Sequence, residues 1–303
     1  MNAVRTTGRL RNVRFAAVAA LGTALASASH AQPGQPGQEI PPWLDIVVAE
    51  AKLGHEADLE DRMREMALAQ AGDANAPQAS VFQVVSGKPN VYHIVIPRAS
   101  MAVADTPAAS PMPPEQMARW EQRISEATES VRFFVARTYP QFTIAADPNA
   151  PEPALLMLRT IQVAPGRQPE YEAWVAQRLM PVLRESNVLG HTMSNGFVGD
   201  SPQNFYHAVP LPNWAALDRN PILEALGEQG FQEFAQSMAG IVQRDEITVF
   251  RPRTDLMGIG EAIGQAQAAQ TAAQVPEQAL AAQAQGQPAQ QGQEQPAQAA
   301  AAN

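Results

Sequence analysis

The sequence of 303 residues contains no cysteine, and only 6% of its residues are aromatic. Without thiols the chain cannot form disulfides, a thiolate metal site or a lipoprotein anchor, and it has no cysteine nucleophile. Its aromatic residues are not interleaved with basic ones, which argues against a stacking surface for single-stranded nucleic acid. Acidic residues outnumber basic ones by 30 to 21, so the formal net charge is −9. Because a phosphate backbone calls for a basic protein face, we expect no nucleic-acid partner.

Motifs for metal or phosphate binding are also missing. The 5 histidines show no H-x-H or H-E-x-x-H spacing and no carboxylates at metal-ligand spacing, so we predict no metal site. Gly227 and Gly230 are not followed by a lysine and do not join a strand to a helix start, which excludes a phosphate loop.

The first 31 residues have the parts of a secretory signal peptide. An arginine-rich segment without acidic residues precedes an apolar run at residues 15–25, and Ser29 and Ala31 occupy the −3 and −1 positions of a cut before Gln32. The run is shorter than the about 20 residues that a membrane span needs, although a retained anchor is the alternative. We therefore expect a periplasmic or secreted protein, cleaved after Ala31, with no membrane span left after signal removal.

The other end of the chain is of low complexity. Residues 258–303 are dominated by alanine and glutamine and contain too few apolar side chains for a core, so they predict a disordered tail. Residues 32–41 are rich in proline, glycine and glutamine and predict a linker. Residues 42–257 remain as the folded region.

Two segments of this region, residues 51–66 and residues 163–180, have similar sequences. In each a glycine, Gly54 or Gly166, follows a strand pattern and precedes an amphipathic helix pattern. Four carboxylates open the first of these helices, and we expect them to form a solvated first turn that offsets the helix dipole: Glu56, Asp58, Glu60 and Asp61.

A second match follows at nearly the same offset. Residues 89–95 (PNVYHIV) align with residues 203–209 (QNFYHAV). We therefore interpret the region as two copies, residues 42–150 and 151–257, in which Asn90, Tyr92 and His93 recur as Asn204, Tyr206 and His207.

Each copy shows the order strand, helix, two hairpin-linked strands, helix and strand, which is the ferredoxin-like β-α-β-β-α-β unit. The expected strands are residues 45–52, 81–86, 91–97 and 141–145, and then residues 155–163, 192–198, 205–211 and 246–250. An apolar stripe from Met117 to Phe134 predicts the second helix of the first copy. The proline-rich residues 99–114 look like an insertion, which we place as a flap near a barrel mouth. Because one such unit leaves a sheet face bare, we predict an α+β fold in which two antiparallel sheets pack as an intramolecular barrel.

The strand before Gly166 carries the pattern R-T-x-x-V-x-P-G from Arg159 to Gly166, and Phe250 precedes Arg251 and Pro252 near the end of the second copy. With these residues the chain resembles the dimeric α+β barrel superfamily, and in particular its NIPSNAP-like and antibiotic-biosynthesis-monooxygenase-like domains. Arg253 and Thr254 interrupt the R-P-D-L ending of that pattern. The resemblance implies the barrel fold and leaves the activity open, since it covers cofactor-free monooxygenases, haem enzymes and proteins of no known activity.

The catalytic candidates are the two histidine–tyrosine pairs. Alternation along a strand puts His93 and His207 on the opposite face from Tyr92 and Tyr206. Histidines that line the barrel could serve as a base, a hydrogen-bond donor or a haem ligand. The alternative is that all four are strand residues kept by both copies for packing.

Three further residues are candidates for ligand binding. Arg159 lies in an apolar strand and needs a carboxylate such as Asp245 or Glu246, or else an anionic ligand. His191 occurs in one copy only, although an exposed loop position is the simpler expectation. Asn204 could hydrogen-bond a ligand, but a strand-end role is the commoner one.

Two interpretations of function follow. The first is an exported protein that binds a small apolar or amphipathic ligand, or an interaction module. The second is an oxidoreductase or monooxygenase that acts on a small aromatic or amphipathic substrate in the barrel, without a cofactor or with haem. We expect no cofactor in the first case, and either a monomer or a homo-oligomer in both.

Overall fold

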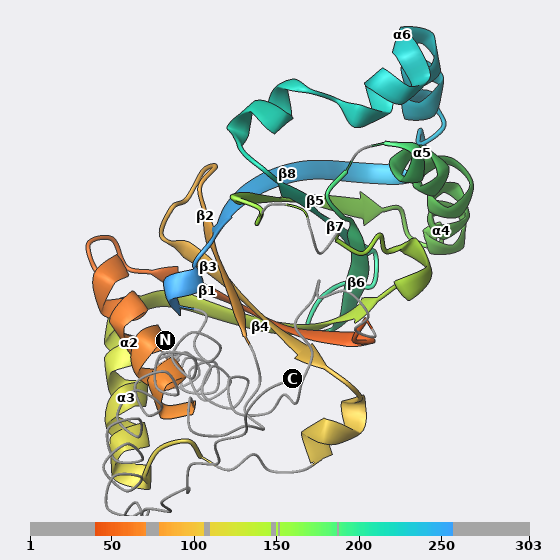
Figure 1. Ribbon diagram of the computed structural model, residues 1–303. Helices are drawn as coiled ribbons and strands as arrows, with labels where there is room; N and C mark the ends of the chain where they lie inside the picture. The colour runs from red at the N-terminus through yellow and green to blue at the C-terminus, as the bar shows by residue number, and fades with distance from the viewer. Residues whose placement is uncertain are drawn as a thin grey trace, which may run out of the picture. The chain divides into compact units, whose positions relative to one another are not determined.

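The computed structural model describes residues 40–70, 79–105, 110–146, 150, 152–186 and 188–256 (Figure 1). The predicted signal peptide and tail, and most of the predicted linker, lie outside the described residues. The strands are β1 (Trp43–Ala51), β2 (Ser80–Val84), β3 (Val91–Arg98), β4 (Thr128–Thr138), β5 (Leu155–Val163), β6 (Thr192–Val198), β7 (Asn204–Leu211) and β8 (Val242–Pro252).

All eight strands belong to one closed antiparallel barrel with the order β1-β3-β2-β8-β5-β7-β6-β4. The strands of the first half, residues 40–146, are neighbours in the order β4-β1-β3-β2, and those of the second half, residues 150–256, in the order β8-β5-β7-β6. Pairing of β2 with β8 and of β4 with β6 joins the halves. Closure removes the open sheet edges that would otherwise invite pairing with other chains.

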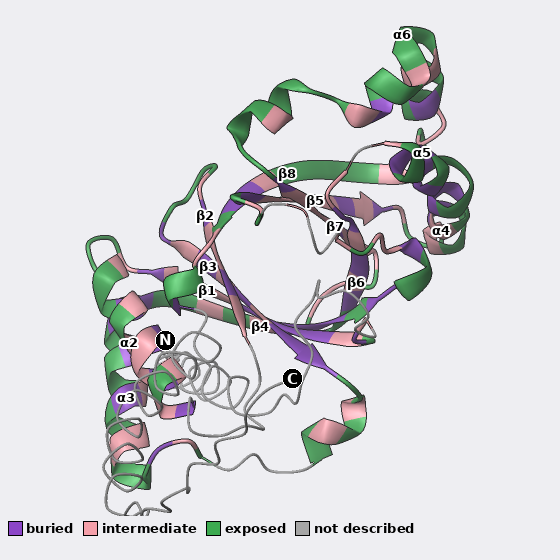
Figure 2. Ribbon diagram, viewed as in Figure 1, coloured by how far each residue is buried: buried purple, intermediate pink, exposed green. Residues whose placement is uncertain are grey.

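Helices lie outside the barrel (Figure 1). The first half carries α2 (Glu56–Gln70) and α3 (Pro114–Ala127), and the second carries α4 (Gln168–Trp174), a π-helical turn (Val175–Leu179), α5 (Met180–Glu185) and α6 (Pro221–Gln236). Short 3-10 helices are η1 (Met101–Asp105), η2 (Pro140–Phe142), η4 (Trp214–Asp218) and η5 (Thr254–Leu256). Figure 2 shows that buried residues follow β4, β6 and β7, whereas α6 is largely exposed.

Three layers of apolar side chains hold the structure together. Trp120 and Tyr92 are buried between the first-half sheet and its helices, and Phe205 is buried between the second-half sheet and its helices. Inside the barrel, Phe134 packs with Tyr206 and with residues of β1. The inner layer therefore joins side chains from both halves.

The last strand of the first half is not where the sequence pattern placed it. The predicted helix ends at Ala127, residues 128–138 form β4, and the predicted strand at residues 141–145 contains η2 and one isolated bridge between Ile144 and His191. Residues 128–138 (TESVRFFVART) are rich in β-branched and aromatic side chains, which favour a strand. The helical spacing of Val131 and Phe134 behind Ala127 is a coincidence.

The match between PNVYHIV and QNFYHAV is out of register by one residue in the structure. The amide of Ala51 donates to the carbonyl of Asn90, and at the equivalent point the amide of Val163 donates to Gln203 rather than Asn204. Counting along β3 and β7 from these bonds places Tyr92 opposite Phe205, His93 opposite Tyr206 and Ile94 opposite His207. The predicted correspondence of Tyr92 with Tyr206 and of His93 with His207 is therefore wrong.

One acidic residue of α2 is not part of a solvated turn as predicted. Glu60 accepts hydrogen bonds from the Tyr92 hydroxyl, at 2.8 Å, and from the Arg253 guanidinium, at 2.8 Å between Nη2 and Oε2. Arg253 also pairs with Asp255. The residue that interrupts the R-P-D-L pattern thus ties the end of the second half to a helix of the first, and this contact holds the pKa of Glu60 below its usual value.

A buried ion pair joins β1 and β3 in the first half. Asp45 is fully buried, and its Oδ2 accepts hydrogen bonds from Nε of Arg98, at 3.0 Å, and from Nη2, while its Oδ1 has no partner. Met112, near the end of the insertion, is buried in the core beneath α2 and α3. This end of the insertion therefore covers the outer face of the sheet.

We predict that Arg98→Leu lowers the free energy of unfolding by about 3–5 kcal/mol, because it leaves the Asp45 carboxylate buried without a cation. The second half has Met157 and Leu211 at the equivalent strand positions. The double variant Asp45→Met/Arg98→Leu, which copies them, should recover most of the loss in denaturant unfolding at pH 7. Equal stability of the single and double variants would contradict this account.

Candidate functional site

A cavity of about 900 Å³ lies outside the barrel, between the outer face of the second-half sheet and the helices beside it. Its walls come from β5, β7, β8, the α4–α5 region, η4 and α6, and they are mainly apolar: Met157, Leu183, Val209, Leu211, Ala216 and Phe234 are examples. The cavity is therefore on the opposite side of the strands from the barrel interior, where the sequence interpretation places a ligand.

The local sequence explains why α6 does not close onto the sheet. Gly227 breaks the helix with a φ of 69°, and only Ile222 and Phe234 of α6 are buried. In Figure 1 α6 stands away from β8. Ile247 of β8 is left 58% exposed at the cavity. The second-half sheet is thus covered by a helix layer with a hollow beneath it.

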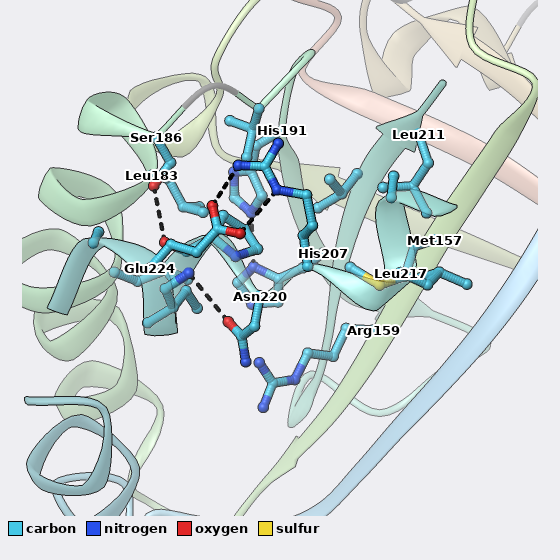
Figure 3. Close-up of a pocket in the computed structure, with 18 of the residues that line it drawn as sticks. Met157, Arg159, Leu183, Ser186, His191, His207, Leu211, Leu217, Asn220 and Glu224 are labelled. Carbon is cyan, nitrogen blue, oxygen red and sulfur yellow. Dashed lines mark hydrogen bonds and ion pairs between the residues drawn. The ribbon is translucent and has the colours of Figure 1, made fainter. Parts of the chain in front are cut away.

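One wall carries a chain of buried hydrogen-bonding groups. His191 Nδ1 lies 2.8 Å from the carbonyl oxygen of Phe142, His191 Nε2 lies 3.0 Å from His207 Nδ1, and His207 Nε2 lies 2.7 Å from the Tyr171 hydroxyl. These side chains are 2%, 4% and 1% exposed for His191, His207 and Tyr171, and all three line the cavity. Figure 3 shows the two histidines side by side.

The carbonyl at one end fixes the direction of this chain. A carbonyl can only accept, so His191 donates from Nδ1 and its neutral Nε2 must accept from Nδ1 of His207. Nε2 of His207 then accepts the proton of Tyr171. Burial lowers the pKa of both histidines and raises that of Tyr171, so all three groups are neutral near pH 7.

Arg159 lies on the same cavity wall and forms the salt bridge predicted from the sequence. Its Nε donates to Oδ1 of Asp245 at 2.8 Å, and its Nη2 donates to Oδ2 of the same carboxylate. The Asp245 carboxylate raises the pKa of Arg159, while burial opposes this. The positive charge at the cavity is therefore already balanced.

His191 is not the exposed loop residue expected from the sequence. It is buried because it pairs with Ile144 in the isolated bridge that brings the loop at Phe142 against it. Tyr171 and the Phe142 carbonyl were missed altogether. In the sequence Tyr171 belongs to an apolar stripe at helical spacing, which is typical of a core residue, and nothing local to Phe142 marks its carbonyl as an anchor.

The other predicted residues do not join this site. Tyr206 and Asn204 point to the barrel interior, where the Tyr206 hydroxyl donates to Asp200 and the Asn204 amide donates to Asp200 Oδ1 at 3.1 Å. Alternation along β7 puts them on the opposite face from His207. The predicted single pocket of His207, Tyr206, Arg159 and Asn204 is therefore wrong.

In the first half the histidine and the tyrosine occupy the opposite faces from those in the second half. Tyr92 faces the helices and contacts Glu60, whereas His93 faces the barrel interior and packs against the ring of Phe250 at a centroid distance of 4.7 Å. Burial, with a smaller effect of the Arg132 charge, lowers the pKa of His93 to about 4.

The described residues contain no group of three or more histidine, cysteine, aspartate or glutamate side chains that could hold a metal ion. Within the same residues no helix is long and apolar enough to cross a membrane.

Haem ligation does not fit the cavity. An axial histidine needs a free ring nitrogen that faces the ligand, but all four ring nitrogens of His191 and His207 have hydrogen-bond partners within the protein. The Arg159 cation, which could meet a haem propionate, is bound to Asp245.

Comparison with known proteins identifies the fold. No protein-family model matches the sequence, and no curated protein matches it. A proposed monooxygenase from Fusobacterium nucleatum superposes with a TM-score of 0.52 at 9% identity, over 71% of this chain and 94% of its own. An anthrone oxidase-like protein superposes with a TM-score of 0.51 at 12% identity, over 73% of this chain and 94% of its own. The chain shares the fold of these two proteins.

A haem-binding protein from Thermus thermophilus also occurs among the similar structures. A chlorite dismutase from Candidatus Nitrospira defluvii superposes with a TM-score of 0.42 at 8% identity, over 71% of this chain and 93% of its own. Likeness at this level carries no argument about a cofactor.

The partly buried, neutral His93 leads to a prediction for acid stability. Below pH 6.5 an unfolded histidine binds a proton that the folded one does not, so stability falls as the pH drops toward about 4. Between pH 7 and pH 5 the free energy of unfolding of the wild type should fall by about 2 kcal/mol more than that of His93→Leu. Denaturant titrations at the two pH values measure this, and equal losses in the two proteins would contradict it.

Proposed function

We propose that this protein binds a small apolar or amphipathic molecule in the cavity of its second half. The observation that carries the proposal is a space of about 900 Å³ with mainly apolar walls and a polar end formed by Tyr171, His207 and Arg159. This is the usual composition of a small-molecule site, in which apolar walls supply affinity and a few polar groups fix orientation.

The two halves of the molecule support this proposal by their contrast. At the strand positions of Arg159, His207 and Val209 the first half has Val47, Ile94 and Ile96, which are all buried in a core that includes Trp120 and Met112. Protein interiors are normally packed to the density of organic crystals. The same framework is therefore filled in one half and hollow in the other, as expected if the hollow serves a ligand.

We predict that a large side chain placed in the cavity weakens ligand binding. Val209→Trp should weaken binding of the neutral fluorophore N-phenyl-1-naphthylamine at least about tenfold, because the indole occupies the ligand's space. The matched control is Leu68→Trp, which adds the same side chain at a position that is 66% exposed on α2. Fluorescence titration measures both, with circular dichroism to confirm the fold. Unchanged affinity in Val209→Trp would refute binding in this cavity.

A second candidate function is an oxidoreductase or monooxygenase that acts without haem. The specific observation is the hydrogen-bonded series from Tyr171 to His191, which could accept a hydrogen bond from a hydroxyl group bound in the cavity. Solved structures with this fold include the proposed monooxygenase and the anthrone oxidase-like protein, and this is an analogy of fold only.

This second candidate predicts oxygen consumption with hydroquinone-type substrates and its loss in Tyr171→Phe, which keeps the ring but removes the hydroxyl. An oxygen electrode measures the rate. A flat trace over a broad panel of substrates, in protein that binds the fluorophore, would leave binding alone as the function.

We also propose export of the chain, supported by the n-region, apolar run and Ser29–Ala31 cleavage pattern of its first residues. A tandem origin from two ferredoxin-like units is supported by the strand order, which in each half places the fourth, first, third and second strands side by side. Assignment to the NIPSNAP-like members is supported by the R-T-x-x-V-x-P-G pattern and by Phe250 before Arg251 and Pro252. Because both halves belong to one chain, the barrel closes without a second protomer.

A further inference from the structure

The hydrogen-bond chain determines what the polar end of the cavity can offer a ligand. The Phe142 carbonyl can only accept, which fixes the donor and acceptor nitrogens of His191 and then those of His207. The Tyr171 hydroxyl therefore donates its proton to Nε2 of His207. The oxygen of Tyr171 therefore has lone pairs but no free proton. Tyr171 lines the cavity, and its hydroxyl can only accept a further hydrogen bond.

The neighbouring cation does not favour an anionic ligand. Arg159 gives two of its donors to Asp245, and the pair is close to neutral as a unit. A carboxylate in the cavity would lose its hydration and would have to compete with Asp245 for the charge of Arg159. The walls around it are mainly apolar.

We propose that the cavity recognises an uncharged, largely hydrocarbon molecule through a hydroxyl donor, such as a phenol or a bulky alcohol, which donates to the oxygen of Tyr171. This rests on the proposed binding function and specifies its ligand class. His191 is a positioning residue in this scheme: it acts through His207 and holds it in the tautomer whose Nε2 accepts the Tyr171 proton.

Removing either histidine should reverse the role of Tyr171. In His207→Ile the Tyr171 proton loses its acceptor and becomes available to a ligand. In His191→Leu, His207 keeps its ring but loses the acceptor for Nδ1–H. Since a buried N–H without a partner is costly, the proton moves to Nε2, which then donates to Tyr171 and again frees the hydroxyl proton.

The first variant has a precedent within the same molecule. Ile94 occupies the equivalent position of β3 and is buried. An isoleucine is thus compatible with this sheet position, and folding of both variants can be checked by circular dichroism.

The test uses three ligands with one ring system: 2-naphthol, which can donate, 2-methoxynaphthalene, which can only accept, and 2-ethylnaphthalene, which does neither. The measured quantity is the ratio of the Kd of 2-methoxynaphthalene to that of 2-naphthol in each protein. Comparing this ratio between proteins cancels the difference in hydrophobicity of the ligands. Leu68→Met, a volume-conserving change at an exposed position on α2, is the control variant.

We expect the ratio to fall at least about fivefold in His207→Ile and in His191→Leu, a change that one reversed hydrogen bond can produce, and to stay constant in Leu68→Met. The affinity for 2-ethylnaphthalene should change little in all of them. An unchanged ratio in proteins that still bind 2-ethylnaphthalene would overturn the inference and leave the binding function intact. If the wild type binds none of the three ligands, the proposed binding function itself is contradicted.

A measurement without variants tests the same inference. Nitrogen-15 NMR of labelled wild-type protein reports which ring nitrogen of a neutral histidine carries the proton. We expect both His191 and His207 to be protonated at Nδ1. Protonation of His207 at Nε2 would refute the proposal, whatever the variants do.

Discussion

Alternation of side chains across the wall of a closed barrel is the constraint on which this structure depends. Each strand has one face in the shared interior and one face toward a helix layer, so a single step along β7 separates Tyr206, inside, from His207, at the cavity. Register therefore decides the chemistry available to each residue. Both strands contain the dipeptide Tyr-His. Because β3 and β7 differ in register by one residue, the tyrosine faces the helices in the first half and the histidine faces them in the second.

The two halves use the same framework in different ways. The first half encloses a charge pair, Asp45 with Arg98, and covers its outer face with α2, α3 and the end of the insertion at Met112. The second half leaves a cavity under a broken helix, and such a space gives up packing contacts that would stabilise the fold. The shared interior layer and the contact of Arg253 with Glu60 join the hollow half to the packed one. Through these contacts the packing of the first half stabilises the whole barrel and offsets the packing contacts that are missing at the cavity of the second half.

Periodicity predicted most of the fold because strands and amphipathic helices are local patterns. The strands β5 and β6 match their predicted ranges, and closure into a barrel follows from two sheets with bare faces. Prediction failed where a pattern was ambiguous: Val131 and Phe134 continue a helical stripe but belong to β4. The site was harder to predict, since Tyr171, His191 and His207 are brought together by register and by the loop at Phe142, and neither is encoded locally. The Arg159 salt bridge could be predicted, because a cation within an apolar strand must find a carboxylate.

A buried histidine pair has two possible neutral arrangements, and an isolated pair would populate both. The Phe142 carbonyl removes this freedom because it cannot donate, so the tautomer of His191 is fixed, then that of His207, and then the direction of the Tyr171 hydroxyl. The position of one backbone oxygen, itself held by the bridge between Ile144 and His191, is thus transmitted through two rings to the wall of the cavity. Burial keeps these three side chains neutral, because a positive charge on either imidazole ring would not be stabilised by water. Whether the Tyr171 hydroxyl donates or accepts a hydrogen bond at the cavity is therefore set by main-chain geometry. The identity of a single cavity residue does not show it.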